Sequence, residues 1–308
     1  MWWLILLLCA WSGTSLTIHV IPHSHCDPGW LDTFETYYVK QVNKILDNSF
    51  KAVKANQNRK FIWAESSFFK RWYEHLNYED RADFKELVGQ GRWEFVGGGW
   101  SQNDEANPDY YAVMNQMTQG HDYLLKTFGV VPTIGWQIDP FGHSRVTPAL
   151  FAAIGFDAMV INRINYQAKD FCKEKHCMEF NWEGADMGDK SQIFTHVLHT
   201  HYSAPKGFDW EERGISPKLT AKNVVQRAAV YIKEIEKRSL DYKTEHILVP
   251  FGDDFKFQNA QLQFEQMDYL IEIIRKEYPD ITIHYSTLSD YFTAVQQNAQ
   301  DNSIGFPT

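Results

Sequence analysis

A histidine and an aspartate two residues apart, His25 and Asp27, form the segment of this sequence that is richest in possible chemistry. They follow the apolar run 16–21, which predicts a strand that ends just before them. In an extended chain, residues i and i+2 point to the same side, so both side chains can reach one ion. Imidazole nitrogen and carboxylate oxygen together suit a divalent metal such as zinc. Trp30 would then stand beside that ion as an aromatic wall, as sugar sites often have.

A plainer interpretation treats Pro22 and the Pro28-Gly29 pair as strand and turn punctuation. A second cluster, however, also places a carboxylate where a predicted strand ends. Asp139 follows the strand predicted at 133–138, and it could ligate a metal, act as a nucleophile or cap the next helix. Ser144 is better placed for capping, which frees Asp139 for another role.

A third cluster is the pair Asp253 and Asp254, which follows the strand predicted at 246–249. Adjacent carboxylates repel, so one of them is expected to keep its proton to higher pH, as a general acid requires. A solvated acidic turn is the alternative. Arg163 follows the strand at 158–161 and could neutralise such acids or hold a substrate hydroxyl; the alternative is a surface ion pair.

The elements that must position these residues alternate along the chain. Strands are predicted at 16–21, 61–63, 93–96, 133–138, 158–161, 193–198, 246–249 and 281–285. Helices are predicted at 33–56, from after 63 to 89, and at 110–128, 146–153, 224–237, 262–274 and 288–297. This alternation predicts an α/β fold with a mainly parallel sheet, open or closed into an irregular barrel, and flanked by helices. In such folds the active site lies beyond the C-terminal ends of the strands, where Glu65 also falls.

Length, charge and cysteines narrow the class of protein. A chain of 308 residues suffices for one large domain or two small ones, and a net charge of -9 argues against nucleic acid as a partner. The apolar start, with small residues after it, predicts a cleaved signal peptide over 1–15 and no stable membrane insertion afterwards. Cys172 and Cys177 are close enough for a local disulfide in an oxidising compartment. Cys26 could ligate the ion, but on a strand it would point away from its neighbours and stay reduced.

Four motifs in this order, HSHCDPGW, GGGWSQNDEA, WQIDPFGHS and PFGDDF, resemble those of the glycoside hydrolase family 38 α-mannosidases. The lysosomal-type, class II branch is the most similar, through the 103–105 segment and the segment from Arg163 to Tyr166. The resemblance runs from about residue 16 to the end of the chain. It implies an N-terminal α/β catalytic domain over 16–308, in a lysosomal or extracellular glycan-degrading protein.

The resemblance also implies site residues and a cofactor. It implies one zinc ion held by His25, Asp27 and Asp139, with Asp139 also the nucleophile and Asp254 the general acid/base of a retaining hydrolase of α-mannosides. The substrate-binding residues that it implies are Trp30, Phe141, Arg163, Tyr202 and Asp253, and the partner is a mannose-containing glycan.

The chain departs from the family pattern in two places. Family members commonly carry Asn or Asp where this chain has Cys26. The family's fourth zinc ligand is a histidine in a downstream segment, which this sequence lacks together with the helical and β-sandwich domains. We therefore expect a weak or inactive fragment of a longer protein. Two alternatives stay open: a polysaccharide deacetylase-like metal hydrolase, which also uses a strand-end His-x-Asp pair, and an inactive mannose-binding remnant.

Overall fold

The structure, a computed structural model, describes residues 16–185, 191–211 and 216–308, and the predicted signal peptide lies outside them. The strands are β1 (Thr17–Pro22), β2 (Phe61–Trp63), β3 (Trp93–Phe95), β4 (Ile134–Gln137), β5 (Ala158–Ile161), β6 (Glu179–Glu183), β7 (Gln192–Val197), β8 (His246–Phe251) and β9 (Thr282–Tyr285). The helices are α1 (Phe34–Tyr37), the π-helical turn η1 (Tyr38–Val42), α2 (Asn43–Ala55), α3 (Ser66–Tyr73), α4 (Tyr78–Gly89), α5 (Tyr110–Phe128), α6 (Val146–Ile154), α7 (Tyr166–Lys175), α8 (Val224–Ser239), α9 (Ala260–Glu277) and α10 (Leu288–Asp301). The predicted α/β class is confirmed.

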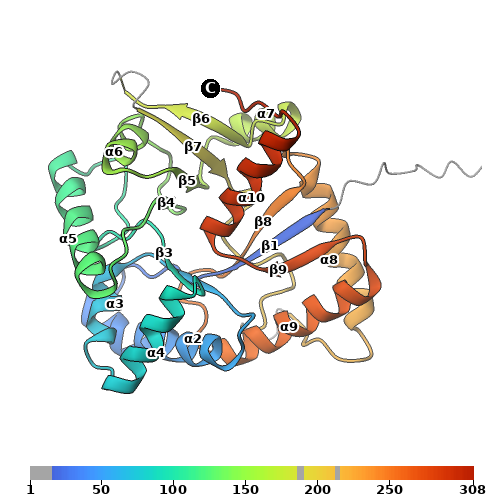
Figure 1. Cartoon of the computed structure of the whole chain (residues 1–308), viewed down its shortest axis with the longest axis horizontal. Helices are drawn as coiled ribbons and strands as arrows, with labels where there is room; N and C mark the ends of the chain where they lie inside the picture. The colour runs from blue at the N-terminus through green and yellow to red at the C-terminus, as the bar shows by residue number, and fades with distance from the viewer. Residues whose placement is uncertain (1–15, 186–190, 212–215) are drawn as a thin grey trace, which may run out of the picture.

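The strands form three hydrogen-bonded groups, with orders β8-β1-β9, β2-β3 and β4-β5-β7-β6. Every pairing is parallel except that of β6 with β7. Single contacts link the groups: His23 bridges to Ile62 beyond β1, and the Gly97 N–H after β3 donates to the Ile134 carbonyl in β4. Within the described residues the strands do not close into a barrel, so of the two predicted forms the open one is observed (Figure 1).

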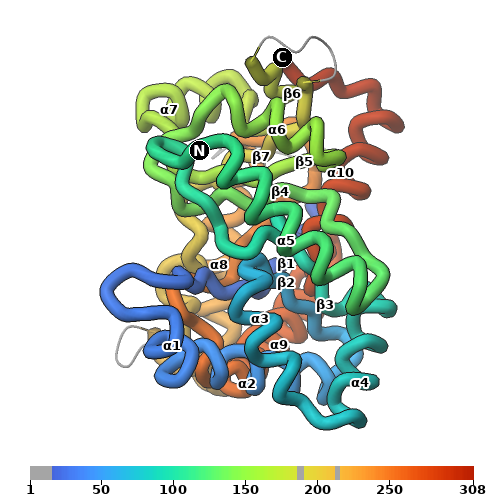
Figure 2. The backbone as a smooth tube through the Cα atoms, turned by 90° about the vertical axis from the view of Figure 1, so that its left-hand side faces the viewer, coloured from blue at the N-terminus to red at the C-terminus, as the bar shows by residue number. Residues whose placement is uncertain are grey.

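Strands β1, β2, β4, β5 and β8 are buried on both faces, as parallel strands covered by helices usually are, whereas the edge strand β6 is mostly half-buried. In β2, Phe61 and Trp63 pack into a large outer core beneath the helices, whereas Ile62 packs into a smaller inner core. The inner core takes side chains from all three groups of strands, and α10 contributes Tyr291 and Phe292 to it. Helices α2, α4 and α9 gather at one end of the molecule and α6 and α7 at the other (Figures 1 and 2). Because the strands that pair in parallel run in the same direction, their C-terminal ends lie on the same side of the molecule.

Local sequence explains where the longest helix begins and stops. The Asp109 carboxylate accepts a hydrogen bond from the Tyr111 N–H at the start of α5, and Gly129 ends the helix with a left-handed backbone. Inside α5, a side chain on Gly120 would collide with the Gly98 carbonyl, since its Cβ would lie 2.0 Å from that oxygen. Gly120 therefore lets α5 pack directly on the loop that leads from β3 toward the strand ends.

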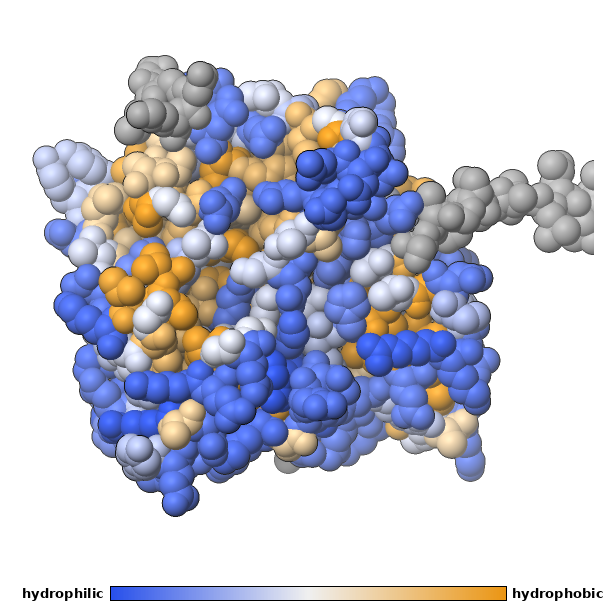
Figure 3. All heavy atoms as spheres, in the orientation of Figure 1, coloured by the Kyte–Doolittle hydropathy of each residue, from blue (hydrophilic) through white to orange (hydrophobic). Residues whose placement is uncertain are grey.

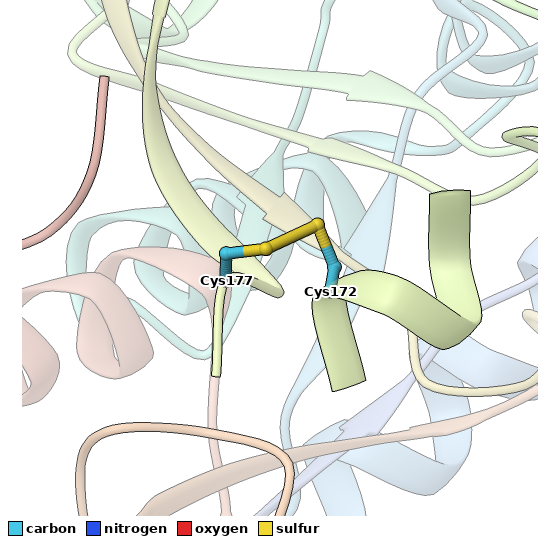
Figure 4. The surroundings of a disulfide bond; sticks show 2 residues. All are labelled: Cys172 and Cys177. Atoms are coloured by element: carbon cyan, nitrogen blue, oxygen red, sulfur yellow. A yellow bond between two sulfur atoms is a disulfide. The ribbon is translucent and has the colours of Figure 1, made fainter. Parts of the chain in front are cut away.

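Two elements were not predicted, α7 and the antiparallel edge strand β6. Helix α7 has no buried residue, so its sequence carries no apolar periodicity. The predicted disulfide between Cys172 and Cys177 is present and joins the end of α7 to the start of β6, with the two Cα atoms 4.4 Å apart (Figure 4). The crosslink fixes the turn between these two elements.

Three histidines, His19 on β1, His246 on β8 and His284 on β9, lie side by side, and we call them the histidine cluster. The two ring nitrogens of His19 contact His246 Nδ1 at 3.0 Å and the Ser286 hydroxyl at 2.8 Å. Burial and the neighbouring rings of His284 and His246 lower the pKa of His19 to about 3. Burial also lowers the pKa of His246 and of His284, so the cluster is uncharged near neutral pH.

The surface shows no membrane-spanning element in the part of the chain that the structure describes, because none of those helices combines sufficient length with sufficient apolarity. On the face shown in Figure 3, hydrophilic residues dominate the lower part over α2, α4 and α9, and hydrophobic residues show mainly toward α5 and α6. Exposed apolar side chains on those two helices include Tyr110, Tyr111, Leu125 and Val146.

Candidate active site

One cavity of about 280 Å³ lies at the C-terminal ends of the strands. Its lining residues are His25, Asp27, Gly29, Trp30, Gln102, Asn103, Asp104, Asp139, Pro140, Phe141, Arg163 and Asp254. All the predicted site residues line it except Tyr202 and Asp253. The Tyr202 hydroxyl contacts the carboxylates of Asp139 and Asp254, and the Asp253 carboxylate accepts from the Asp254 N–H. The structure thus brings together side chains that are up to about 230 residues apart in the sequence, as the ends of parallel strands allow.

His25, Asp27 and Asp139 form the candidate metal site, with their ligand atoms all within 4.8 Å of one another. His25 Nε2 lies 3.2 Å from Asp27 Oδ1 and 3.6 Å from Asp139 Oδ2, yet this nitrogen makes no well-aligned hydrogen bond. Burial disfavours a charged ring, but the carboxylates of Asp139, Asp27 and Glu65 outweigh it and raise the pKa of His25 to about 10. The carboxylates therefore favour a positive charge between His25, Asp27 and Asp139. The imidazole nitrogen and carboxylate oxygens of these residues are ligand atoms that fit a divalent cation such as zinc.

Asp139 is held by two side chains, and neither belongs to the following helix. Arg163 donates to Asp139 Oδ1 from Nε at 3.1 Å and from Nη2 at 2.7 Å, and the Tyr202 hydroxyl lies 3.0 Å from the same oxygen. The Ser144 hydroxyl accepts from the Val146 N–H at the start of α6, although the N-cap position itself is Arg145, whose side chain makes no capping bond. Burial works against ionisation, but His25 and Arg163 hold the pKa of Asp139 well below its usual range. Asp139 is therefore an ionised carboxylate.

Asp254 has the opposite electrostatic environment. Burial raises its pKa, the charges of Asp253 and Asp139 add to this, and His25 and the Tyr202 hydroxyl oppose it. The Tyr202 hydroxyl, 2.9 Å from Asp254 Oδ1, bridges the two carboxylates. Asp139 is thus held ionised, whereas Asp254 retains a proton more readily. Such a difference in pKa between two carboxyl groups is typical of sites in which one acts as a nucleophile and the other as an acid.

Close packing brings Asp254 to this position. A Cβ on Gly252 would lie 2.3 Å from the His23 carbonyl, so only glycine lets the end of β8 pass the end of β1. The Asp254 N–H donates to the Asp253 carboxylate, which gives Asp253 a supporting place outside the cavity lining. Phe255 then takes a left-handed backbone with φ 51°, held by its N–H donating to the His25 carbonyl.

Aromatic rings flank the mouth of the cavity. Trp30 is 70% exposed and Phe141 is 82% exposed, so both rings are accessible to a ligand in the cavity. The Arg163 guanidinium lies 4.6 Å from the centre of the Phe141 ring, so one arginine contacts both the ring and Asp139. The two rings offer stacking surfaces beside the carboxylates that line the cavity.

The motif residue Glu105 has a supporting role that sequence reasoning did not identify. Its buried carboxylate accepts hydrogen bonds from His143 Nδ1, the Ser144 N–H and the Thr147 hydroxyl, at 2.8, 2.8 and 2.6 Å. The turn that carries Asp139 and Phe141 is thereby tied to the loop after β3. Sequence gave no signal for this pairing, because acceptor and donors lie about 40 residues apart. Cys26, in contrast, matches its prediction: its thiol is free, buried and outside the metal group.

Comparison with known proteins gives consistent matches. A family model described as "Glycosyl hydrolases family 38 N-terminal domain" matches residues 15–307. Alpha-mannosidase B of Dictyostelium discoideum is 41% identical over 310 residues, covering 91% of this chain and 30% of the relative. Lysosomal alpha-mannosidase of the same organism is 38% identical, covering 92% and 30%. The crystal structure of an alpha-mannosidase from Enterococcus faecalis V583 aligns with a TM-score of 0.70 at 19% identity, covering 92% of this chain and 29% of that one. The chain thus spans about 30% of the length of the curated relatives named here.

Proposed function

The chain belongs to glycosyl hydrolase family 38, and from this membership and the geometry of the cavity we propose that it carries the active site of a zinc-dependent, retaining α-mannosidase. The proposed reaction removes terminal α-mannosyl residues from oligosaccharides such as N-glycans. Since the chain covers only part of the length of its relatives, the activity of the whole protein belongs to this proposal.

One observation carries the proposal: a single tyrosine hydroxyl bridges two carboxylates whose pKa values are displaced in opposite directions. Tyr202 Oη lies 3.0 Å from Asp139 Oδ1 and 2.9 Å from Asp254 Oδ1. These two distances put the oxygens within about 6 Å of each other, compared with about 5–5.5 Å between the carboxyl groups of retaining glycosidases. The spacing leaves little room for a water molecule opposite the leaving group, as an inverting enzyme would need.

The two carboxylates divide the chemistry between them. Asp139, held ionised by Arg163 and His25, attacks the anomeric carbon and forms a covalent glycosyl ester. Asp254, with its raised pKa, donates a proton to the leaving glycosidic oxygen. It then takes a proton from the water that cleaves the ester, so the product keeps the configuration of the substrate.

His25, Asp27 and Asp139 would hold the zinc ion through one imidazole nitrogen and two carboxylate oxygens. When bound, zinc would supply Lewis-acid stabilisation of charge on the sugar. Trp30 and Phe141 would stack against the sugar ring, and Arg163 and Tyr202 would orient its hydroxyls and the reacting carboxylates. Asp253 would support the orientation of Asp254.

A place in the secretory pathway, lysosomal or extracellular, belongs to the same proposal. The Cys172–Cys177 disulfide supports it, because disulfides persist in oxidising compartments. The similarity to a relative named lysosomal alpha-mannosidase adds support. Mass mapping of secreted material would test it, and free thiols at both cysteines would count against it.

The decisive experiment measures turnover of an aryl α-mannoside by this chain and by the longest natural form, with zinc added and withdrawn. Proton NMR of the first product reports its anomeric configuration, and an activated fluoro-mannoside that traps the intermediate should label the peptide containing Asp139. Inverted product, or a label on another carboxylate, would refute the assignment of Asp139. Turnover of an acetylated glycan alone would favour a deacetylase, and mannose binding without any turnover would favour a binding remnant.

A further inference from the structure

Glu65 is a fully buried carboxylate at the candidate site that the proposed reaction leaves without a task. It follows β2 and immediately precedes α3, and its side chain has an exposure of 0%. The backbone N–H groups of Cys26 and of Glu65 itself act on this carboxylate, but neither of its oxygens makes a well-aligned hydrogen bond with a described residue. A buried carboxylate without such a partner is costly, so its retention calls for a physical reason.

Capping of α3 does not supply that reason. Glu65 occupies the N-cap position, but its side chain makes no capping hydrogen bond. The first backbone donors of the helix are already taken, since the Ser66 and Ser67 N–H groups donate to the Gly99 and Trp100 carbonyls. The Glu65 side chain is therefore free of its own helix.

The side chain faces His25 instead. Glu65 Oε1 lies 3.8 Å from His25 Nδ1, and Nδ1 also has no well-aligned hydrogen-bond partner. The other ring nitrogen, Nε2, faces Asp27 and Asp139. The imidazole thus stands between one buried carboxylate on its Nδ1 side and the candidate metal ligands on its Nε2 side. The neighbouring strands β1 and β2, joined where His23 bridges to Ile62, hold the two side chains at the same edge.

We propose that Glu65 is a positioning residue for the metal site: it accepts a hydrogen bond from the Nδ1–H of His25 and so directs Nε2 toward the ion. This inference rests on the proposed zinc site. Metal-ligating histidines commonly donate their second ring N–H to a carboxylate, which fixes the ring orientation and the tautomer. The Tyr202 ring, with its centroid 5.5 Å from that of His25, packs against the imidazole and limits its rotation. Glu65 then sets which nitrogen meets the ion.

The test compares Glu65→Leu, which removes the acceptor, with Glu65→Gln, which keeps an oxygen able to accept from Nδ1–H. The matched control is Glu179→Gln, at another buried carboxylate, which accepts from His196 Nδ1 at 3.0 Å away from the cavity. Zinc affinity is measured by competition with a chelator. We expect the Leu variant to lose roughly 10- to 100-fold in affinity, the Gln variant to lose less, and the control to match wild type. Wild-type affinity in a folded Leu variant, or an equal loss in the control, would overturn the proposal.

A second measurement needs no metal and separates this inference from the proposed function. In the metal-free protein, a downfield, slowly exchanging Nδ1–H proton of His25 should appear in the NMR spectrum and vanish in the Leu variant. Its absence from wild type would overturn the role of Glu65 even if zinc binds. If wild type shows the proton but binds no zinc, the proposed metal site fails while the Glu65–His25 contact stands. If Glu65→Leu does not fold, the Gln variant carries both measurements. A loss of affinity below about 10-fold, together with a proton resonance that persists at a shifted position, supports the acceptor role, and loss of the resonance contradicts it.

Discussion

Replacement of Tyr202 by phenylalanine tests the bridge between the two carboxylates most directly. Tyr202→Phe removes one oxygen and leaves the packing in place, because His23 Nε2 contacts the backbone carbonyl of Tyr202, not its hydroxyl. The Arg163 guanidinium, 5.8 Å from the Tyr202 ring centre, also keeps its neighbour. The perturbation is therefore confined to the hydroxyl that lies between Asp139 and Asp254.

The expected loss of activity in Tyr202→Phe follows from the single proton of the Tyr202 hydroxyl. One hydroxyl has one proton, so it donates to only one of its two carboxylates at a time, and the variant loses one charge-assisted hydrogen bond. Such a bond contributes about 1.5 to 3 kcal/mol, which corresponds to a fall of roughly 10- to 150-fold in kcat/KM. The Tyr202 hydroxyl also lowers the pKa of Asp254, so its removal should raise that pKa further. The acid form of Asp254 then persists to higher pH, and the alkaline limb of the pH–rate profile moves upward.

The assay is a pH profile of kcat/KM on an aryl α-mannoside, with a carboxyl carbon-13 NMR titration of Asp254 as a readout that requires no turnover. Tyr242→Phe is the matched control, since this buried hydroxyl donates to the Val197 carbonyl at 3.0 Å, away from the cavity. Wild-type kcat/KM together with an unmoved Asp254 titration in Tyr202→Phe would refute the reasoning. So would an equal loss in the control.

Three further predictions concern the site, the crosslink and the histidine cluster. Asp139→Asn should abolish essentially all turnover, because no covalent intermediate can form, and should lower zinc content in metal analysis; unchanged zinc would place the metal elsewhere. Replacing Cys172 and Cys177 by serine should cost at most about 2 kcal/mol in urea unfolding, because the loop is short; a loss well above that would show a wider role. Since the pKa of His19 falls from 6.5 to about 3, its contribution to stability is complete above pH 6.5 and is lost as the pH falls toward 3. Between pH 7 and pH 5 that loss is about 2 kcal/mol, and His19→Gln should show correspondingly less acid sensitivity; equal sensitivity would contradict this.

The parts of the fold that could be predicted are those with strong periodic burial. Runs such as 158–161 are apolar because both faces of the strand are covered, and α5 shows helical spacing from end to end. These signals place the strand ends, and with them the positions of His25, Asp139 and Asp254. Elements without burial gave no such signal, and α7 was therefore missed.

Contacts between elements could be predicted only where chemistry suggested a partner. Arg163 was expected to neutralise an acid, but the sequence could not tell that this acid is Asp139. Glu65 was recognised as a strand-end residue, yet its approach to His25 depends on which strands are neighbours, and spacing along the chain does not encode that. The same holds for the hydrogen bonds of Glu105, which connect loops distant in sequence.

The separate bonding of the strand groups gives the candidate metal site a consequence for local unfolding. His25 and Asp27 follow β1, whereas Asp139 follows β4. Among the described residues, backbone hydrogen bonds connect these two groups of strands through β2-β3 and through single contacts such as Gly97 to Ile134 and Ala204 to Gly252. An ion bound by all three side chains would crosslink the β8-β1-β9 group of strands to the β4-β5-β7-β6 group. Because the ion binds only when the two groups lie together, its binding stabilises that native arrangement by mass action. Amide hydrogen exchange should therefore slow on zinc addition at the β3–β4 junction, while the interior of β8-β1-β9 keeps its metal-free rate.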